Sequence, residues 1–374
     1  MQLTYKFRLY PTRNQEAKLL TNLELCRWVY NYFLSQWQKQ KKIPSKYELQ
    51  AQLPKLKSEK PELLNVHSKV LQMVLYQLYS NLKALAKLKK KGRKVGKLRF
   101  KGKGWYKTLN FNQTGFCLIR TNKRLDRLHL SKIGDIPIRL HRTINGKVKG
   151  VIVKRYRTGE WYALFQVEVK PELLSQNSKV VGIDVGIKHF LTDSDGRQIE
   201  NPNFYKRSIE KIKKYHRYLS RKKRGSRNRN KARVKLSRAY QKLERQRDDF
   251  LHKLSRFYVN NYKLIAIEDL SITSMVRGHY LAKRILDASW GKFFQMLTYK
   301  AASAGRLVIK VDPRGTSQEY NYGNIDRDYN ASLNILTRAL GQGLSEVTPV
   351  EIEPLPELIR VPASSIIEAG SPFR

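Results

Sequence analysis

Two short apolar runs in this sequence each enclose an acidic residue. Asp184 lies in VVGIDVGI, and Glu268 lies in LIAIEDL. Runs of this length and composition are typical of buried strands. A lone carboxylate inside such a strand costs several kcal/mol unless it is paired or coordinates a metal ion. The two runs therefore predict an α/β unit with acids in its central strands, and each acid is expected to be paired or to bind a metal ion.

The residues around these acids favour a functional role. Gly182 and Gly186 flank Asp184 two positions away on either side, and glycines let a substrate or another backbone come close. Glu268 stands at the C-terminal end of its predicted strand, where sites in α/β proteins usually form. Each acid alone is weak support, because a strand aspartate is more often a structural hydrogen-bonding group.

A third acid comes from NIDRDYNASLNIL (324–336), where Asp326 and Asp328 stand just ahead of a predicted helix. Acids in a first helical turn are common because they complement the helix dipole. Asp328 shares one helical face with the small residues Ala331 and Ser332, which leave room beside a metal, whereas Asp326 points elsewhere. We therefore predict that Asp328 is a ligand and that Asp326 is a helix-start acid.

Three carboxylates with few nitrogen or sulfur ligands suit hard cations such as Mg²⁺ or Mn²⁺. Two such ions, about 3.5–4 Å apart, clamp the attacking and leaving oxygens of a phosphodiester. The ordered set therefore predicts Asp184, Glu268 and Asp328 as catalytic, metal-binding residues. Three other acids are expected to lie outside the site: Asp193, Asp195 and Asp269.

The chain is strongly basic, with 75 lysines and arginines against 30 acids and a net charge of +45. This excess indicates a polyanionic partner, of which nucleic acid is the default. The densest run, RKKRGSRNRNKARVK (221–235), lies in a helical region over about 204–261 that is interrupted at Gly225-Ser226, which predicts a basic helical hairpin. A charge run is usually only a solvated face, but repulsion this dense favours a nucleic-acid contact.

Other classes have little support. There is no apolar run of membrane-spanning length and no signal peptide, so a membrane role is not expected. Cys26 and Cys117 form no CxxC pair, which argues against a disulfide scaffold or a cysteine zinc site and fits a reducing cytoplasm.

The N-terminal half divides by its periodicity. LTYKFRLYP (3–11) alternates as a half-buried strand does, whereas 12–88 shows helical spacing. Residues 98–170 return to short alternating runs, with Asn145-Gly146 as a predicted hairpin turn. We expect the first strand to pair with this β-rich module, so that the helical block is an insertion. Residues 341–374 are predicted to be a poorly ordered tail.

Several motifs together resemble the TnpB (OrfB) family of transposon-encoded proteins, which is related to the type V CRISPR effectors. The resemblance runs over essentially the whole chain and rests on YKFRLYPTRNQ (5–15), GIDVGIKH (182–189), IAIEDLSI (265–272), SWGKFFQMLTYKA (289–301), TSQ (316–318), DRDYNASLNIL (326–336) and EAGSP (368–372). It implies an α/β multidomain fold: a β-barrel wedge domain over 1–11 and 89–177, an inserted helical recognition domain over 12–88, and an RNase H-like (RuvC-like) nuclease domain over 178–340.

The resemblance also implies a function. Members are RNA-guided DNA endonucleases that use a guide RNA from the transposon end and cut DNA next to a short transposon-adjacent motif. Carried onto this chain, it implies Asp184, Glu268 and Asp328 as the metal-binding catalytic acids, with Mg²⁺ or Mn²⁺, and double- and single-stranded target DNA as substrate. We expect a monomer with its RNA, in the cytoplasm of a prokaryotic cell and on the nucleoid when bound to DNA.

Nucleic-acid contacts are predicted for basic and polar residues of the first strand, the helical block, the basic hairpin and the segment after strand 307–313. In the helical block, the four candidates for reading the adjacent motif could equally be plain helix-surface residues. The full set is Lys6, Arg8, Tyr47, Ser68, Lys69, Gln72, Arg221, Lys222, Arg224, Arg227, Arg229, Lys231 and Arg314.

One departure from the family leaves alternatives open. Many members carry four cysteines after TSQ that form a zinc ribbon, but here TSQ runs through EYNYGNI straight to Asp326 without a cysteine, so no zinc is expected. An RNA-guided DNA-binding protein or repressor with weak or no cleavage is therefore the main alternative. A transposase that joins DNA ends without RNA is a weaker one.

Overall fold

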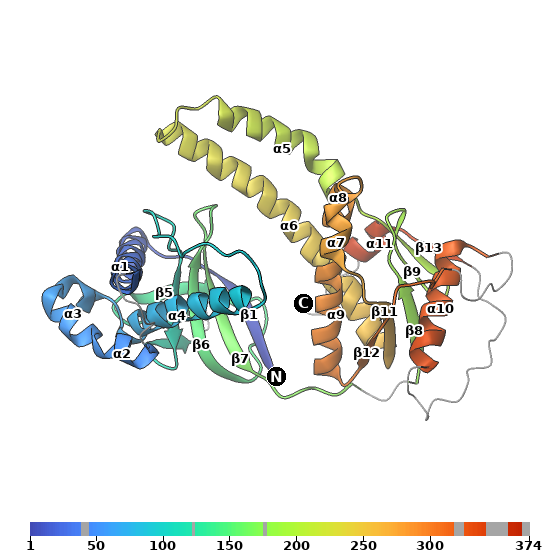
Figure 1. Cartoon of the computed structure of the whole chain (residues 1–374), viewed down its shortest axis with the longest axis horizontal. Helices are drawn as coiled ribbons and strands as arrows, with labels where there is room; N and C mark the ends of the chain where they lie inside the picture. The colour runs from blue at the N-terminus through green and yellow to red at the C-terminus, as the bar shows by residue number, and fades with distance from the viewer. Residues whose placement is uncertain (39–44, 122–123, 175–177, 318–324, 342–357, 369–374) are drawn as a thin grey trace. The chain divides into compact units, whose positions relative to one another are not determined.

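The chain forms two compact units, residues Met1–Val169 and Lys170–Arg374 (Figure 1). The computed structural model describes residues 1–38, 45–121, 124–174, 178–317, 325–341 and 358–368. Among these residues, no helix combines the length and the apolar character needed to cross a membrane.

The first unit is built on a seven-stranded antiparallel sheet in the order β2-β6-β7-β1-β5-β4-β3. Its strands are β1 Gln2–Leu9, β2 Thr108–Asn112, β3 Phe116–Ile119, β4 Asp126–Leu130, β5 Gly134–Arg139, β6 Lys147–Arg155 and β7 Trp161–Glu168. The expected pairing of the first strand with this module is confirmed. β1 pairs with β7 along its whole length but with β5 only at Arg8 and Leu9.

The helices of this unit come between β1 and β2 in the chain. They are α1 Arg13–Gln38, α2 Lys46–Ala51, α3 Leu53–Glu59, the 3₁₀ helix η1 Pro61–Asn65 and α4 Ser68–Lys90. A reciprocal capping pair starts α1: the Gln15 amide donates to Thr12 Oγ1, and the Thr12 amide donates to Gln15 Oε1. The predicted apolar stripe of α4 is buried and packs into the same core as the sheet: Val70, Leu71, Val74, Leu75 and Leu78.

The hairpin predicted at Asn145-Gly146 is wrong. Gly146 does adopt a positive φ of 112°, but the strands on either side of it, β5 and β6, are not neighbours in the sheet. β6 pairs instead with β2 and β7. The dipeptide therefore lies in a connection between two strands that are not neighbours, β5 and β6. A turn signal fixes only the local backbone and does not determine the partner of the strand that follows.

The second unit contains a six-stranded mixed sheet in the order β12-β11-β8-β9-β10-β13. Its strands are β8 Val180–Asp184, β9 His189–Asp193, β10 Arg197–Glu200, β11 Leu264–Glu268, β12 Leu307–Val311 and β13 Ile359–Val361. β8, β11 and β12 are parallel neighbours, whereas β9 is antiparallel to both β8 and β10. The helices are α5 Phe204–Ser220, α6 Arg227–Asn261, α7 Ile272–Arg277, α8 Ala282–Ala288, α9 Trp290–Ala304, α10 Arg327–Gly341 and α11 Ala363–Glu368.

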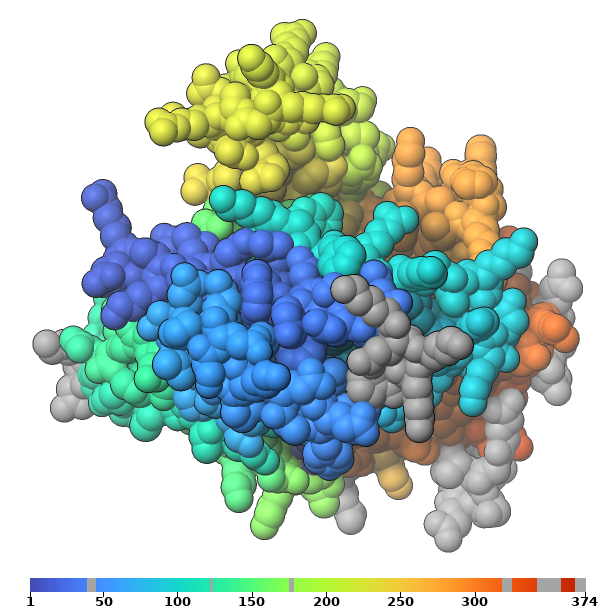
Figure 2. Space-filling model, turned by 60° about the vertical axis from the view of Figure 1, so that its left-hand side comes forward, coloured from blue at the N-terminus to red at the C-terminus, as the bar shows by residue number. Residues whose placement is uncertain are grey.

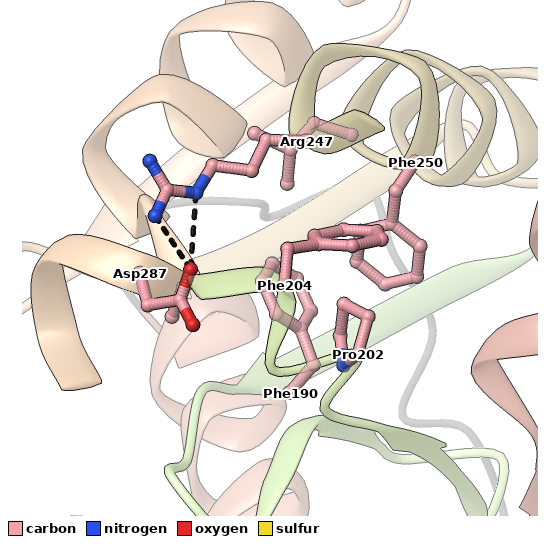
Figure 3. Close-up of a pocket in the computed structure, with 8 residues that line it drawn as sticks. Phe190, Pro202, Phe204, Arg247, Phe250 and Asp287 are labelled. Carbon is pink, nitrogen blue, oxygen red and sulfur yellow. Dashed lines mark hydrogen bonds and ion pairs between the residues drawn. The ribbon is translucent and has the colours of Figure 1, made fainter. Parts of the chain in front are cut away.

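The predicted basic hairpin is confirmed as α5 and α6, which lie side by side (Figure 1). Its base is anchored by Asp287 of α8, which accepts hydrogen bonds from the Tyr205 amide and from Arg247 Nη2 at 2.6 Å. Figure 3 shows this ion pair beside a cavity walled by aromatic side chains. The cavity measures about 10 Å³, which is room for one water at most, so it is a packing gap and not a ligand site.

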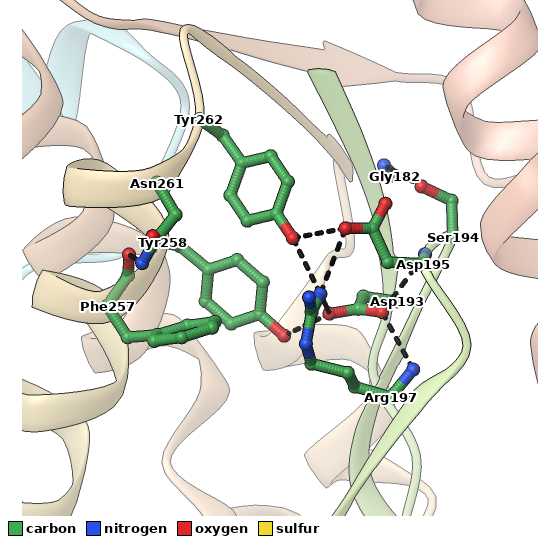
Figure 4. A network of polar contacts seen from close by, with 9 residues as sticks. All are labelled: Gly182, Asp193, Ser194, Asp195, Arg197, Phe257, Tyr258, Asn261 and Tyr262. Atoms are coloured by element: carbon green, nitrogen blue, oxygen red, sulfur yellow. Dashed lines mark hydrogen bonds and ion pairs between the residues drawn. The ribbon is translucent and has the colours of Figure 1, made fainter. Parts of the chain in front are cut away.

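A buried polar network fixes the turn between β9 and β10 to the end of α6 (Figure 4). Asp193 is fully buried and accepts hydrogen bonds from the Tyr258 hydroxyl at 2.9 Å and the Arg197 amide at 2.9 Å. Asp195 accepts from Tyr262 and from Arg197. The prediction that these acids belong to a turn is confirmed, and the structure adds that they join two elements far apart in the sequence.

The prediction of a poorly ordered tail over 341–374 is wrong for residues 358–368. Ile359–Val361 forms β13 and pairs with β10, and α11 follows it. Ala363 is buried, with Val361 and Ile366 against the same core. These few apolar side chains pack the segment against the core. The prediction fails because it rests on the average composition of 341–374, which is dominated by the acidic, proline-containing stretch that precedes them. Gly341 is the last residue of α10, and residues 342–357 and 369–374 lie outside the described part.

Candidate active site

Asp184 and Glu268 end two neighbouring parallel strands. β8 and β11 pair in register, with Ile183 opposite Ile267. The next residue on each strand is therefore an acid, and both acids emerge at the same edge of the sheet. This is the edge where α/β sites usually form. The predicted pair is thus brought together by strand register alone.

Helix α10 brings the third acid to this edge. It packs against β8 at Gly182, where a Cβ atom would lie only 2.1 Å from the carbonyl oxygen of Ser332. One turn earlier on α10, the carboxylate of Asp328 lies beside Gly186, since a Cβ on Gly186 would be 3.7 Å from Asp328 Oδ2. The prediction that other groups approach the two glycines closely is confirmed. At Gly182 the approaching group is the backbone of helix α10.

The two aspartates at the start of α10 have different roles. Asp326 Oδ1 accepts hydrogen bonds from the amides of Asp328 at 3.0 Å and Tyr329 at 3.3 Å. These are amides of the first helical turn, which lack partners within the helix. Asp326 therefore caps the helix, as predicted, and leaves Asp328 as the acid that faces the strand ends.

The charges of the other two acids act on Asp184. The pKa of Asp184 is raised to about 7, first by burial and then by the carboxylates of Glu268 and Asp328. Burial also raises the pKa of Glu268, against the opposing effects of the Thr316 hydrogen bond and the positive charge of Arg338. Like charges gathered at a partly buried point disfavour their own ionisation. A cation at this point would offset that repulsion.

Thr316 orients one of these acids and was not singled out as a site residue from the sequence. Its Oγ1 donates a 2.6 Å hydrogen bond to Glu268 Oε1, and both side chains are buried. Its carbonyl accepts from Asn334 Nδ2 of α10 at 2.8 Å. The available signal was its position: Thr316 follows β12, the parallel neighbour of the strand that carries Glu268.

The donor set fits a hard cation in chemical type, since all three groups offer carboxylate oxygens. Within the described part of the chain, however, no three His, Cys, Asp or Glu side chains lie close enough to hold a metal ion together. A fourth acid, Asp269, follows Glu268 in the sequence but pairs with Lys310 Nζ at 2.8 Å on the exposed surface. The candidate set thus stays at three acids.

Comparison with known proteins decides the family. A protein of Streptomyces pristinaespiralis named "Putative RNA-guided DNA endonuclease" is 30% identical over 365 residues, covering 90% of this chain and 89% of that protein. A relative from Escherichia coli (strain K12), which carries the same name with the suffix InsQ, is 27% identical over 340 residues, covering 85% and 82%. The chain belongs to the TnpB (OrfB) family.

Family models match three segments of this TnpB-family chain. Residues 164–278 match the OrfB_IS605 model, described as a probable transposase, and residues 1–42 match its helix-turn-helix domain. Residues 290–335 match the Cas12f1-like TNB domain. A solved Cas12f1 complex with guide RNA and target DNA shares the fold, with a TM-score of 0.59 at 14% identity, over 90% of this chain and 98% of that one.

Two of the basic residues predicted to bind nucleic acid in β1 already have partners inside the protein. Arg8 forms an ion pair with Glu160 and a 3.3 Å hydrogen bond to the Tyr162 hydroxyl. The Lys6 ammonium lies 4.5 Å from the centre of the Tyr156 ring and 4.7 Å from that of Tyr162. Neither side chain is therefore a free cation in this structure.

In the basic hairpin, Arg229 also has an internal role. Its Nη1 donates to the carbonyls of Leu219 at 3.1 Å and Lys222 at 2.8 Å, which closes the turn between α5 and α6. The Lys222 ammonium lies 4.6 Å from the centre of the Tyr218 ring. The other predicted cations of the hairpin are exposed: Arg221, Arg224, Arg227 and Lys231.

The remaining candidates lie at the surface. Tyr47 is 67% exposed, and Ser68, at the start of α4, accepts a 2.8 Å hydrogen bond from Lys57 Nζ. Lys69 and Gln72 on α4 are partly exposed, and Arg314 is exposed in the turn after β12. Their contact with nucleic acid stays a prediction.

Proposed function

We propose that this TnpB-family chain is an RNA-guided DNA endonuclease that hydrolyses phosphodiester bonds of target DNA next to a short transposon-adjacent motif. The observation that carries the proposal is the gathering of Asp184, Glu268 and Asp328 at one sheet edge. Relatives named as RNA-guided DNA endonucleases support the same activity. A binding protein has no need to bury the carboxylate of Asp184 beside those of Glu268 and Asp328, which raise its pKa.

In this proposal the three acids would hold one or two Mg²⁺ or Mn²⁺ ions. Bound there, such ions supply Lewis acidity and a metal-activated water for phosphodiester hydrolysis. The other residues keep the acids in place. Thr316 holds one oxygen of Glu268, and Asp326 fixes the helix start that presents Asp328.

The proposed architecture follows the family. Residues 178–340 would form the RuvC-like nuclease domain, 1–11 with 89–177 the wedge domain, and 12–88 the recognition domain. The exposed cations of the basic hairpin would follow the backbone of a guide–target duplex, while base pairing reads the sequence. The protein would act in the cytoplasm as a monomer with its guide RNA.

The test begins with sequencing of the RNA that copurifies from the native locus. A discrete RNA that ends in the transposon flank defines the target for a Mg²⁺-dependent cleavage assay. Asp184→Ala should abolish cleavage and keep RNA and DNA binding. Asp269→Ala is the matched control, because Asp269 is an exposed acid beside Glu268 and should be dispensable. Equal cleavage by both variants would overturn the assignment.

A second candidate is an RNA-guided DNA-binding protein without efficient cleavage. Two observations favour it: the sequence lacks the four cysteines of the family's zinc ribbon, and the described carboxylates do not close to metal-ligand spacing. Under this candidate the wild type binds its target, leaves it uncut at saturating Mg²⁺, and is unchanged by Asp184→Ala.

A further inference from the structure

The segment between α4 and β2 lies in a long stretch of the chain that has many cations and no acids. Residues 91–107 read KGRKVGKLRFKGKGWYK, and no Asp or Glu occurs anywhere between Glu62 and Asp126. The segment has no helix or strand, yet it carries three aromatic residues among its cations, of which Phe100 and Trp105 are exposed and Tyr106 is buried. In Figure 2 this cyan stretch lies at the surface of the first unit.

The middle of the segment is anchored to helix α1. The Lys101 amide donates to Asn31 Oδ1 at 2.8 Å, and the Lys101 carbonyl accepts from Asn31 Nδ2 and Arg27 Nη1, both at 3.0 Å. At the end of the segment Tyr106 is buried, and its hydroxyl donates to Gln77 Oε1 at 3.1 Å. Polar side chains of two helices thus hold a basic loop in one place.

Between these two anchors, Trp105 is displayed to solvent. Its side chain is 74% exposed, and Phe100 is 52% exposed. A turn fixes Trp105, since its amide donates to the Gly102 carbonyl at 3.1 Å and Gly104 takes a positive φ of 72°. The indole lies over Gly102, where a Cβ would be 3.3 Å from Trp105 Cδ1. The ring is therefore held with most of its surface open.

We propose that Trp105, together with Phe100, is a stacking platform for unpaired bases of the guide RNA. Every base has a π-face, so an exposed aromatic ring set among lysines and arginines binds single strands by combining base stacking with phosphate attraction. The inference rests on the proposed function in one respect. In an RNA-guided nuclease the guide RNA stays bound, so the guide is the single strand that would cover the rings of Trp105 and Phe100.

The charge of the segment decides between classes of partner. An apolar protein surface would not require a tract free of acids, whereas a single-stranded nucleic acid would place a phosphate beside the exposed Lys103. The Lys101 ammonium lies 4.7 Å from the centre of the Tyr30 ring and is already occupied. A stacking site also predicts a specific energetic signature. Loss of the ring weakens binding at every salt concentration, while loss of a lysine changes the salt dependence itself.

The test uses the full-length protein, stripped of copurified nucleic acid in high salt, and a fluorescein-labelled 20-nucleotide RNA without secondary structure. Binding is measured at several salt concentrations for the wild type and three variants: Trp105→Ala, Trp105→Phe and Lys103→Gln. We expect Trp105→Ala to weaken binding by about tenfold or more with an unchanged slope of log K against log salt. Trp105→Phe should recover most of the loss, and Lys103→Gln should lower the slope.

Because the ring is exposed, Trp105→Ala should fold normally, and its thermal melting curve checks this. Wild-type affinity in Trp105→Ala would overturn the platform. A larger loss for a single-stranded DNA of the same sequence than for the RNA would overturn the assignment to RNA. The outcome is independent of cleavage: weakened RNA binding in a protein that never cuts DNA would leave the platform standing and remove the proposed nuclease function.

Discussion

The substitution Gly182→Ala tests how the candidate site is assembled. Gly182 lies in β8 between two paired strands, and α10 crosses it closely. An added Cβ would lie 2.1 Å from the carbonyl oxygen of Ser332 and 2.9 Å from both the amide nitrogen and the Cβ of Leu336. Real Cβ atoms are essentially never closer than 3.0 Å, so α10 must retreat by about an ångström.

The expected cost follows from what can move. Overpacking a core typically destabilises by 1–3 kcal/mol, and the upper end applies because the nearest obstructing atom, the carbonyl oxygen of Ser332, is backbone. The smaller entropy of the unfolded alanine chain offsets about 0.4–1 kcal/mol. A net loss of about 2 kcal/mol lowers the melting temperature of a unit of this size by about 4–8 °C. Since α10 carries Asp328, we also expect cleavage to fall by about 10²-fold.

The assay is thermal unfolding followed by cleavage at a temperature where the variant is still folded. Gly291→Ala is the matched control, because its Cβ would meet nothing closer than Ile272 Cγ1 at 3.9 Å and it lies in helix α9. Alanine there should be neutral or stabilising by up to about 1 kcal/mol. If Gly182→Ala melts and cleaves like the control, the close helix–strand contact does not position Asp328.

Three further substitutions test other parts of the structure. Thr316→Val removes the hydrogen bond to Glu268 and should slow cleavage about tenfold without weakening nucleic-acid binding, whereas Thr316→Ser should restore it; equal rates in both variants would contradict the role. Tyr258→Phe removes a donor from buried Asp193 and should lower the free energy of unfolding by about 1–2 kcal/mol in denaturant, while an unchanged midpoint would show that the bond contributes nothing. Burial lowers the pKa of Lys300 to about 7, whereas its pKa in the unfolded state is near 10.4. Between these two pH values the unfolded state binds one proton more than the folded state. The free energy of unfolding therefore falls as the pH falls, by at most about 1.4 kcal/mol per pH unit. Unfolding measured at pH 7.5 and 9.5 should show this slope in the wild type and a smaller one in Lys300→Met, and parallel slopes would refute the assignment.

The three candidate acids could be predicted because their signals are local. Asp184 and Glu268 stand in apolar runs that require a strand, and an acid there needs an explanation whatever the fold. The choice between Asp326 and Asp328 needed only helical geometry. The capping hydrogen bonds to Asp326 Oδ1 agree with that choice.

The features that the sequence did not predict depend on which elements become neighbours. Thr316 matters only because β12 pairs beside β11. Likewise, Asn145-Gly146 looks like a hairpin turn until the sheet order shows that β5 and β6 are apart. Arg229 reads as one more cation of a basic run, and only the fold shows that it closes the hairpin. Strand partners and side-chain partners of this kind are tertiary choices that no local pattern encodes.

Hydrogen bonds hold α10 against the strand that carries Glu268 and against the residues that follow β12. The three candidate acids can therefore keep their positions although the interval between residues 317 and 325 is short. On one side Thr316 bonds to Glu268 through its hydroxyl and to Asn334 through its carbonyl. On the other side Arg338 of α10 donates through Nη1 to the carbonyl of Asp312 at 2.6 Å. These bonds join β11, the end of β12 and α10 directly. The position of Asp328 relative to Glu268 is thus set by the packed helix and strands, through bonds among residues that lie on either side of the interval between residues 317 and 325.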